Sequence, residues 1–360
     1  MAKLPNYVKK TALFAMIAGV GGLWVLQLIF AYLAELESLS DSYQMQDVFW
    51  YIFYKAPYFL VQFAPTGVLL GAVVGLGLLA NHSEIVVMRS AGVSLYRIVG
   101  WVMQPAVLFV LMALAVNQWV LPVANHHAKN INSTDTSLVS ISGYWVVAPR
   151  ADDANVQEVV YVGYADTEGK LKDVKRFDVA DGTLLGAMSA PTGYYDDSQT
   201  DRYQWQLQDV DTIWLNNHAI KQDSAHQAVI TLPISKESVH LLTKAPEDLA
   251  ITELYQHSEL MRHQDSRSLR HELAFWQKVL SPFAVLSLVL IACSFVFGSL
   301  RSQSLGLRIV MALLTGLLFS YAQDLSGFVA LTTGWSPLLM AGLPILISAV
   351  VGAYLIGKKG

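Results

Sequence analysis

Six long apolar stretches with almost no charge divide this chain of 360 residues. They cover roughly residues 12–34, 56–80, 98–122, 279–300, 309–331 and 337–357. A bilayer's hydrocarbon core takes about 20 apolar helical residues, and lipid offers no partner for backbone amides. Each stretch is therefore predicted to be a transmembrane helix, although the fifth carries one acid, Asp324. This pattern predicts a membrane protein before any motif is considered.

The charges between the stretches predict the orientation, because cytoplasmic segments of membrane proteins are rich in Lys and Arg. With both termini inside, the inside segments hold nine cations against one acid, Glu84. These cations are Lys3, Lys9, Lys10, Arg89, Arg97, Arg301, Arg308, Lys358 and Lys359. The first outside loop is acidic, and its charged residues are Glu35, Glu37, Asp41, Asp47 and Lys55. We therefore expect both termini in the cytoplasm.

Composition agrees with this class, since 54% of the residues are hydrophobic and the mean hydropathy is +0.40. The first apolar stretch is about twice as long as the core of a cleavable signal peptide, so we expect it to remain as a span. The single cysteine, Cys293, lies in the fourth stretch. A lone thiol there acts as a small apolar side chain and forms no internal disulfide.

A long polar insert separates the third stretch from the fourth. Residues 125–271 hold 13 Lys and Arg against 21 Asp and Glu, and the predicted orientation places them outside. Residues 203–208 alternate as half-buried strands do, and short β-prone runs recur at 144–147, 159–162 and 177–179. Turn-forming residues separate these runs, which predicts an all-β sandwich or jellyroll of about 100 residues. Both a filled interior and a cleft for an apolar ligand are compatible with the pattern.

The predicted fold is an α-helical membrane protein with six transmembrane helices and an inserted all-β, jellyroll-like domain. Residues 1–124 would form the first three spans, with a short cytoplasmic helix at 83–92. Residues 125–245 would form the β domain, and residues 246–360 a linker helix and the last three spans.

The sequence offers no catalytic centre. The nearest approach to a phosphate-binding loop, residues 163–171, has one residue too many and Leu171 where Ser or Thr is needed. His126 and His127 have no obvious third metal ligand, and the pair at 271–272 lacks the second histidine of a zinc protease. We therefore predict a protein that is not an enzyme, with no metal site and no cofactor.

The most unusual segment is the short inside loop at residues 81–94. Asn81 or Ser83 can cap a helix, Glu84 favours the positive end of its dipole, and Gly92 favours a left-handed exit. The predicted helix of about two turns is too short to be stable alone. It carries four consecutive apolar residues, 85–88, which need burial beside water. That burial is provided either by the protein's own spans and the lipid head groups or by a groove on a cytoplasmic partner.

These residues resemble a known family. Residues 75–80 (GLGLLA) and 83–92 (SEIVVMRSAG) are similar to the hallmark loop of the LptF/LptG permeases, the membrane subunits of a lipopolysaccharide-export ABC transporter. Residues 119–122 (WVLP), 295–302 (FVFGSLRS) and 306–308 (GLR) are similar as well. The likeness covers the spans at both ends of the chain, whereas the insert matches by position and type. Within the family, the LptG branch is the more similar.

The resemblance implies a permease subunit of an ATP-driven transporter in the inner membrane of a Gram-negative bacterium. The transporter would extract lipopolysaccharide and pass it to a periplasmic bridge toward the outer membrane, with the β domain in the periplasm. The implied partners are a paralogous permease, two copies of a cytoplasmic ABC ATPase, periplasmic bridge proteins, lipopolysaccharide and membrane lipids, and no nucleic acid. The 83–92 helix would couple to the ATPase through Ser83, Glu84, Ile85, Val87, Met88, Arg89 and Gly92.

Cations near the outer membrane surface are candidates for binding lipid phosphates. Lys278, near the outer end of the fourth stretch, is the first candidate, although such a lysine can simply reach up to the interface. The weaker candidates are Lys55, Arg262, Arg267 and Arg270. Lysines can follow the first span in the family, whereas this chain has acids there.

Three glycines, Gly67, Gly71 and Gly75, recur every four residues along the second stretch. They form a smooth stripe that lets another helix approach closely. That helix belongs either to the same subunit or to the paralogue.

Two other classes are compatible with a membrane protein that has an outside domain. A permease of the lipoprotein-release type usually has four spans and a large insert after the first. A membrane sensor with a periplasmic ligand domain needs a signalling domain inside. Six predicted spans and short inside loops disfavour both.

Overall fold

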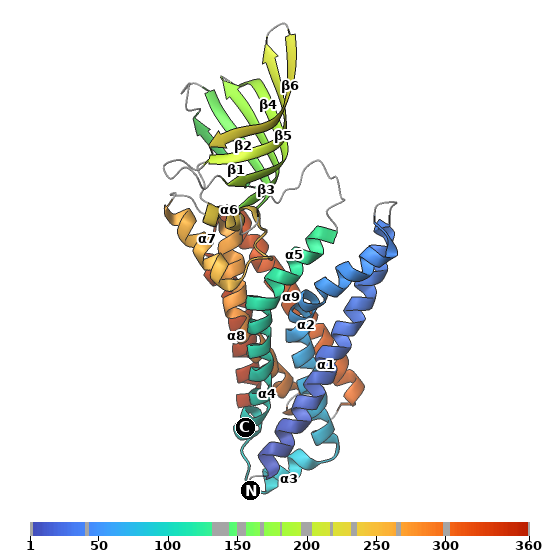
Figure 1. Ribbon diagram of the computed structural model, residues 1–360. Helices are drawn as coiled ribbons and strands as arrows, with labels where there is room; N and C mark the ends of the chain where they lie inside the picture. The colour runs from blue at the N-terminus through green and yellow to red at the C-terminus, as the bar shows by residue number, and fades with distance from the viewer. Residues whose placement is uncertain are drawn as a thin grey trace. The chain divides into compact units, whose positions relative to one another are not determined.

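The computed structural model describes residues 3–39, 43–131, 144–149, 156–165, 169–180, 182–195, 204–216, 219–231, 236–263, 268–297 and 303–358. The chain divides into two compact units. The helical unit contains residues 1–135, 250–252 and 267–360, and the β unit contains residues 136–249 and 253–266. Each unit is described by itself below (Figure 1).

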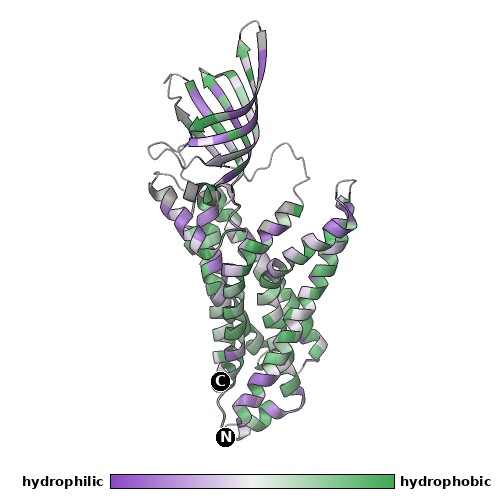
Figure 2. Ribbon diagram, viewed as in Figure 1, coloured by the Kyte–Doolittle hydropathy of each residue, from purple (hydrophilic) through white to green (hydrophobic). Residues whose placement is uncertain are grey.

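The helical unit contains α1 (Lys3–Glu35), η1 (Leu36–Ser38), α2 (Met45–Asn81), α3 (Glu84–Ser90), α4 (Leu95–Ala115), η2 (Val116–Val120), α5 (Leu121–Ile131), α8 (Leu269–Phe297), α9 (Leu305–Thr333) and α10 (Pro337–Gly357). Six helical segments of the described chain are long and apolar enough to cross a membrane, and they match the six predicted spans. Figure 2 shows apolar residues along all of them. The predicted fold class is confirmed.

The second span begins earlier than the sequence pattern predicts. We expected residues 35–55 to be an outside loop, but α2 already begins at Met45 and includes Asp47 and Lys55. The reason is a capping box, in which the Asp47 carboxylate accepts a hydrogen bond of 2.9 Å from the backbone N–H of Gln44. The aromatic run at residues 49–54 is therefore helical and belongs to the span.

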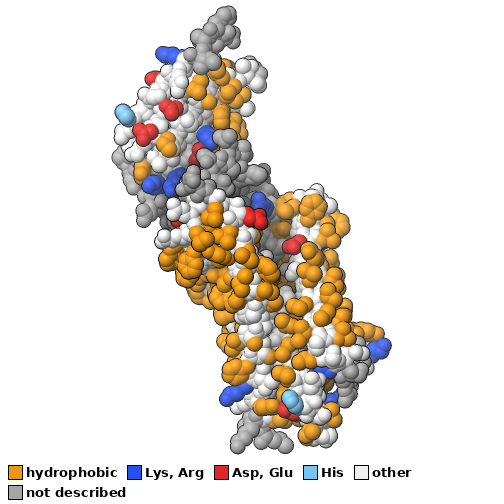
Figure 3. Space-filling view, turned by 90° about the vertical axis from the view of Figure 1, so that its right-hand side faces the viewer, with side chains coloured by type: hydrophobic (Ala, Val, Ile, Leu, Met, Phe, Trp, Pro, Cys, Tyr) orange, Lys and Arg blue, Asp and Glu red, His pale blue; other side chains and the backbone are white. Residues whose placement is uncertain are grey.

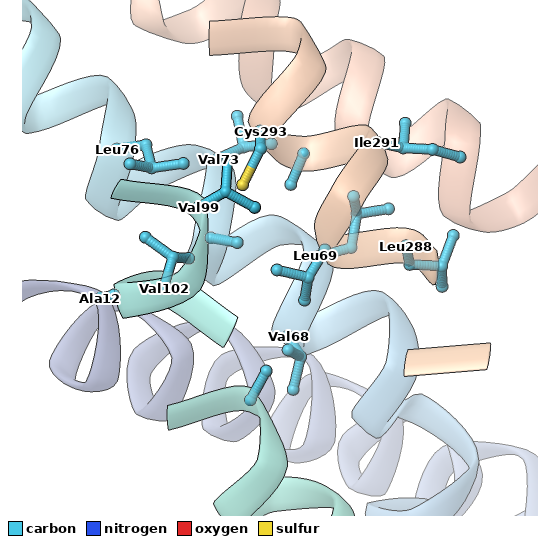
Figure 4. Close-up of a cluster of buried hydrophobic side chains, with 14 of the residues drawn as sticks. Ala12, Val68, Leu69, Val73, Leu76, Val99, Val102, Leu288, Ile291 and Cys293 are labelled. Atoms are coloured by element: carbon cyan, nitrogen blue, oxygen red, sulfur yellow. The ribbon is translucent and has the colours of Figure 1, made fainter. Parts of the chain in front are cut away.

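The core of the helical unit lies where α2 packs between α1, α4 and α8. Figure 4 shows Val68, Leu69, Val73 and Leu76 of α2 facing Val99 and Val102 of α4 and Leu288, Ile291 and Cys293 of α8. Cys293 is fully buried in this cluster, as expected for an apolar filler. In Figure 3, hydrophobic side chains cover the visible middle of the helical unit, and charged side chains gather near its ends.

The β unit consists of one six-stranded antiparallel sheet whose strands follow one another in sequence order. Its strands are β1 (Tyr144–Pro149), β2 (Val156–Ala165), β3 (Lys170–Ala180), β4 (Thr183–Tyr195), β5 (Gln204–Asn216) and β6 (Ala219–Thr231). The sheet is curved (Figure 1), and its inner face is apolar and buried. Helix α6 (Lys236–Thr243) adds Val239 and Leu242 to that core, and α7 (Ile251–His263) follows.

One line of residues across the sheet interrupts the alternation of side chains. Asp173 and Asp209 both have φ near 52°, in the left-handed region that non-glycine residues seldom adopt. As a result Leu171 and Val174, three residues apart on β3, are both buried, and Leu207 and Val210 repeat this on β5. Buried and exposed side chains therefore alternate strictly along β3 and β5 only on either side of this line.

Candidate functional site

Helix α3 has two unlike faces. Ile85 and Met88 are only 6% and 4% exposed and belong to the core of the helical unit, whereas Val86 and Val87 are 49% and 65% exposed. The protein's own spans therefore bury two of the four apolar residues and leave the other two exposed. One pair anchors α3 to its own bundle, and the other pair faces outward.

The end of α3 follows the sequence prediction, but its beginning does not. The backbone N–H groups of Gly92 and Val93 donate to the carbonyls of Arg89 and Met88, and Gly92 has φ of 84°, as in a Schellman motif. Of the two residues predicted as possible caps, Asn81 and Ser83, it is Ser83 that directly precedes the helix, but it is left-handed with φ of 58° and its side chain makes no capping bond. Its backbone carbonyl accepts from the Val87 N–H at 3.1 Å instead.

Glu84 and Arg89, two further residues predicted to couple to the ATPase, belong to the same helix. Glu84 accepts a hydrogen bond of 3.0 Å from the hydroxyl of Tyr7 in α1, and Arg89 is exposed. A small cavity of about 80 Å³ separates α3 from the end of α8, with Ile85 on one side and Phe297 on the other. Helix α3 therefore contacts α1 and α2 directly, and it shares a small cavity with the end of α8.

A large apolar groove of about 1070 Å³ lies elsewhere in the helical unit. It lies between the second half of α1, the first half of α2, and the segment η2–α5. These parts are at the end of the helical unit that is remote from α3 and from both chain termini (Figure 1). Its lining is Trp24, Val25, Leu28, Ile29, Tyr32, Leu33, Phe49, Ile52, Phe53, Tyr54, Ala56, Pro57, Leu60, Val116, Trp119, Val120, Val123, Ala124 and His127. Pockets for drug-sized ligands occupy about 300–1,000 Å³, so this groove is large enough for a bulky apolar group.

A turn of π-helix shapes one wall of the groove. Residues Val116–Val120 form this turn, which ends two residues before Pro122. Proline has no N–H to continue the helical ladder, and π turns of this kind are frequent at functional sites. The turn carries Trp119, which is 72% exposed, to the groove.

The mouth of the groove is polar. The ring of His127 stacks on Tyr54 with a centroid distance of 5.0 Å, and both residues border a second pocket that includes Asp47. Nearby, the hydroxyl of Tyr43, just before α2, donates a hydrogen bond of 3.2 Å to Glu35 at the end of α1. Burial, together with the negative charge of Glu35, raises the pKa of Tyr43 well above its ordinary value.

The predicted phosphate-binding cations are not brought together in the groove. Lys55 is half-buried with its ammonium 5.3 Å from the ring centre of Tyr58, and Lys278 is half-buried in α8. Arg270 is exposed at the start of α8. The side chain of Arg262 and the whole of Arg267 lie outside the described residues. None of the described residues that line the groove is Lys or Arg.

The glycine stripe of α2 lies against α1. A Cβ atom at Gly67 would lie 2.6 Å from Val20 Cα, and one at Gly75 would lie 3.2 Å from Ala12 Cα. A Cβ at Gly71 would collide with the backbone of Met16. The backbones of α1 and α2 can therefore approach this closely only because these three positions have no side chain.

Several features of the candidate site are not evident from the sequence. The groove and the bond between Tyr7 and Glu84 join residues far apart in the chain, so no local pattern indicates them. Arg308, counted above as an inside cation, is only 2% exposed, and its guanidinium lies near Gly77. The one available signal was the aromatic run at residues 49–54, which is typical of a membrane interface.

The fold and the groove together define a class: a membrane protein with six candidate spans, an all-β insert and a large apolar groove among its helices. A family model described as "Lipopolysaccharide export system permease LptF/LptG" matches residues 6–358. The LptG permease proteins of Haemophilus influenzae and of Escherichia coli K12 are each 27% identical to the chain, over 99% of it and 98% of their own length.

The chain belongs to the LptF/LptG family of lipopolysaccharide export permeases. It is a multi-pass inner-membrane protein and a permease subunit of lipopolysaccharide export, and its similarity to LptG proteins confirms the expected branch. The comparisons support neither the lipoprotein-release permease nor the sensor.

Proposed function

We propose that a separate cytoplasmic ATPase drives this permease by docking on α3. The observation that carries this proposal is the division of α3 into an anchored face and an exposed face. Ile85 and Met88 fix the helix to the bundle, so a force on the exposed Val86 and Val87 is passed to the spans. Two adjacent exposed valines beside Arg89 suit a shallow apolar groove on a partner.

The structure also decides which residue tests the docking. A charge at Met88 would be buried in the core and would damage the fold, so its effect on docking could not be interpreted. Val87 is 65% exposed, so Val87→Asp leaves the bundle intact and places a charge on the docking face. We expect the ATPase to co-purify with the wild-type permease and to be lost with Val87→Asp. Full retention of the ATPase by this variant would contradict the docking proposal.

The assembly that we propose around this chain contains one paralogous permease, two copies of the ATPase and periplasmic bridge proteins. In it the chain has both termini in the cytoplasm, and the β unit lies in the periplasm. The charge asymmetry between the loops supports this orientation. Co-purification of all three kinds of partner from membranes is the corresponding test.

We further propose that the apolar groove holds acyl chains of lipopolysaccharide while cations near the outer surface hold its phosphates. The nearly continuous apolar lining supports the first part, and it lies in the half of the spans that faces the periplasm in the proposed orientation. Lys278, Lys55 and Arg270 remain candidates for the second part, together with Arg262 and Arg267. His127 and Tyr54 at the mouth are further polar groups within reach of a head group.

Site-specific photocross-linking tests the groove. Ile29 and its neighbour Phe30 are similarly exposed, at 52% and 59%, but only Ile29 lines the groove. A photoreactive residue at position 29 should therefore cross-link lipopolysaccharide, whereas the same residue at position 30 should cross-link mainly bulk phospholipid. Equal labelling of lipopolysaccharide from both positions would contradict the assignment.

A further inference from the structure

The hydroxyl of Tyr7 joins the beginning of α1 to the beginning of α3. It donates a hydrogen bond of 3.0 Å to the Glu84 carboxylate, between residues 77 positions apart in the chain. Tyr7 lies near the first turns of α1, and Glu84 is the first residue of α3. This bond is therefore a direct polar link between a span and the helix on which we propose that the ATPase docks.

The middle of α1 packs closely against the glycine stripe of α2. Its buried residues Ala12, Met16 and Val20 lie against the three glycines of α2. The opposite face is exposed along the helix, as at Phe14 (67%) and Ile29 (52%). This stripe without side chains on α2 can serve as a pivot for α1. On the groove side of it, the indole N–H of Trp24 donates a hydrogen bond of 2.8 Å to the carbonyl of Ala56, which ties α1 to the first half of α2 there.

The dimensions of α1 make it a lever. It is one unbroken helix of 33 residues that begins at Lys3, and it forms a wall of the groove from Trp24 to Leu33. Taking Met16 as the pivot, Tyr7 lies about 14 Å to one side and Ile29 about 20 Å to the other, at 1.5 Å per residue. A rigid rotation of α1 about Met16 would therefore move Ile29 somewhat farther than Tyr7 and in the opposite direction.

We propose that the hydrogen bond between Tyr7 and Glu84 transmits the movement of α3 to α1, so that ATPase action moves the α1 wall of the groove. Tyr7 is thus a positioning residue that acts on the cargo through α1. The inference rests on the proposed docking of the ATPase on α3, but it concerns a separate step. Docking requires the exposed valines, whereas transmission requires the Tyr7 hydroxyl.

The test uses Tyr7→Phe in the complete complex in lipid nanodiscs. Spin labels on cysteines at Leu26 of α1 and Leu108 of α4, both exposed and neither lining the groove, report the position of α1 in a Cys293→Ala background. We expect wild-type docking and ATP hydrolysis with Tyr7→Phe, loss of the nucleotide-dependent distance change, and a several-fold fall in lipopolysaccharide released per ATP. Tyr96→Phe, at a tyrosine 63% exposed near the start of α4, is the matched control and should behave as wild type.

A second variant separates this bond from the charge of Glu84. Glu84→Gln keeps an oxygen that accepts a hydrogen bond from Tyr7. The nucleotide-dependent change in the distance between the two spin labels should therefore persist in those Glu84→Gln permeases that bind the ATPase. An unchanged distance response in Tyr7→Phe would overturn the inference and leave the docking proposal intact. Loss of docking in Tyr7→Phe and in Tyr7→Met would overturn it too, because Tyr7 would then act on docking itself. Absence of docking in the wild type would instead refute the proposed function.

Discussion

Removal of two carbons from the exposed face of α3 should weaken ATPase binding by a calculable amount. Val87→Ala deletes two carbons, each worth about 0.8 kcal/mol when fully buried. Val87 is 65% exposed in the free subunit, so docking can bury at most about that fraction of it. The product is about 1 kcal/mol, which corresponds to a roughly fivefold increase in the Kd for the ATPase.

Val350→Ala in α10 is the matched control, because Val350 is 66% exposed and lies on another helix. The assay is titration of purified ATPase onto permease in nanodiscs, followed by interferometry. Both variants should keep the melting temperature of the wild type, since neither side chain is part of the core. An unchanged Kd for Val87→Ala, or an equal increase for Val350→Ala, would refute the reasoning.

Three further outcomes are expected. Gly71→Val should lower the melting temperature of the helical unit, because overpacking costs about 1–3 kcal/mol. Gly21→Ala should not lower it, because nothing lies within 4 Å of the added carbon. Equal effects of the two substitutions would contradict the claim that the glycine stripe is needed for the packing of α1 on α2. Lys278→Glu should weaken lipopolysaccharide binding about tenfold or more without loss of assembly, as for a charge-assisted contact with phosphate, and unchanged binding would exclude Lys278. Because the pKa of Tyr43 is raised in the fold, its contribution to stability is complete below its ordinary pKa near 10 and is lost as the pH rises further. The alkaline fall in melting temperature should therefore be smaller in Tyr43→Phe, and an unchanged profile would contradict this.

The spans were predictable because each is a long apolar run, and a run of that length has one stable form in lipid. The start of α2 was not predictable in the same way. Asp47 and Lys55 flank the aromatic residues there and resemble a loop in sequence, whereas the capping box with Gln44 makes the segment helical. Local charge alone therefore marks the ends of a span poorly.

The candidate site was only partly predictable, for a physical reason. The helix at 83–92 has local signals, and Gly92 occupies the expected left-handed position. Which of its apolar residues is buried depends on the spans around it, and the sequence could not tell Met88 from Val87. The groove depends on three segments that meet only in the fold, and the strand pattern slips at Asp173, where a left-handed residue changes the face of its neighbours.

The most direct test of the account is the solvent access of Val87 in the working complex. A cysteine at this position, in a Cys293→Ala background, should react readily with a water-soluble maleimide in the isolated permease, since Val87 is exposed. The account predicts that bound ATPase protects this cysteine from the reagent. Equal labelling with and without the ATPase would contradict the claim that α3 is the site at which the motor acts on this permease.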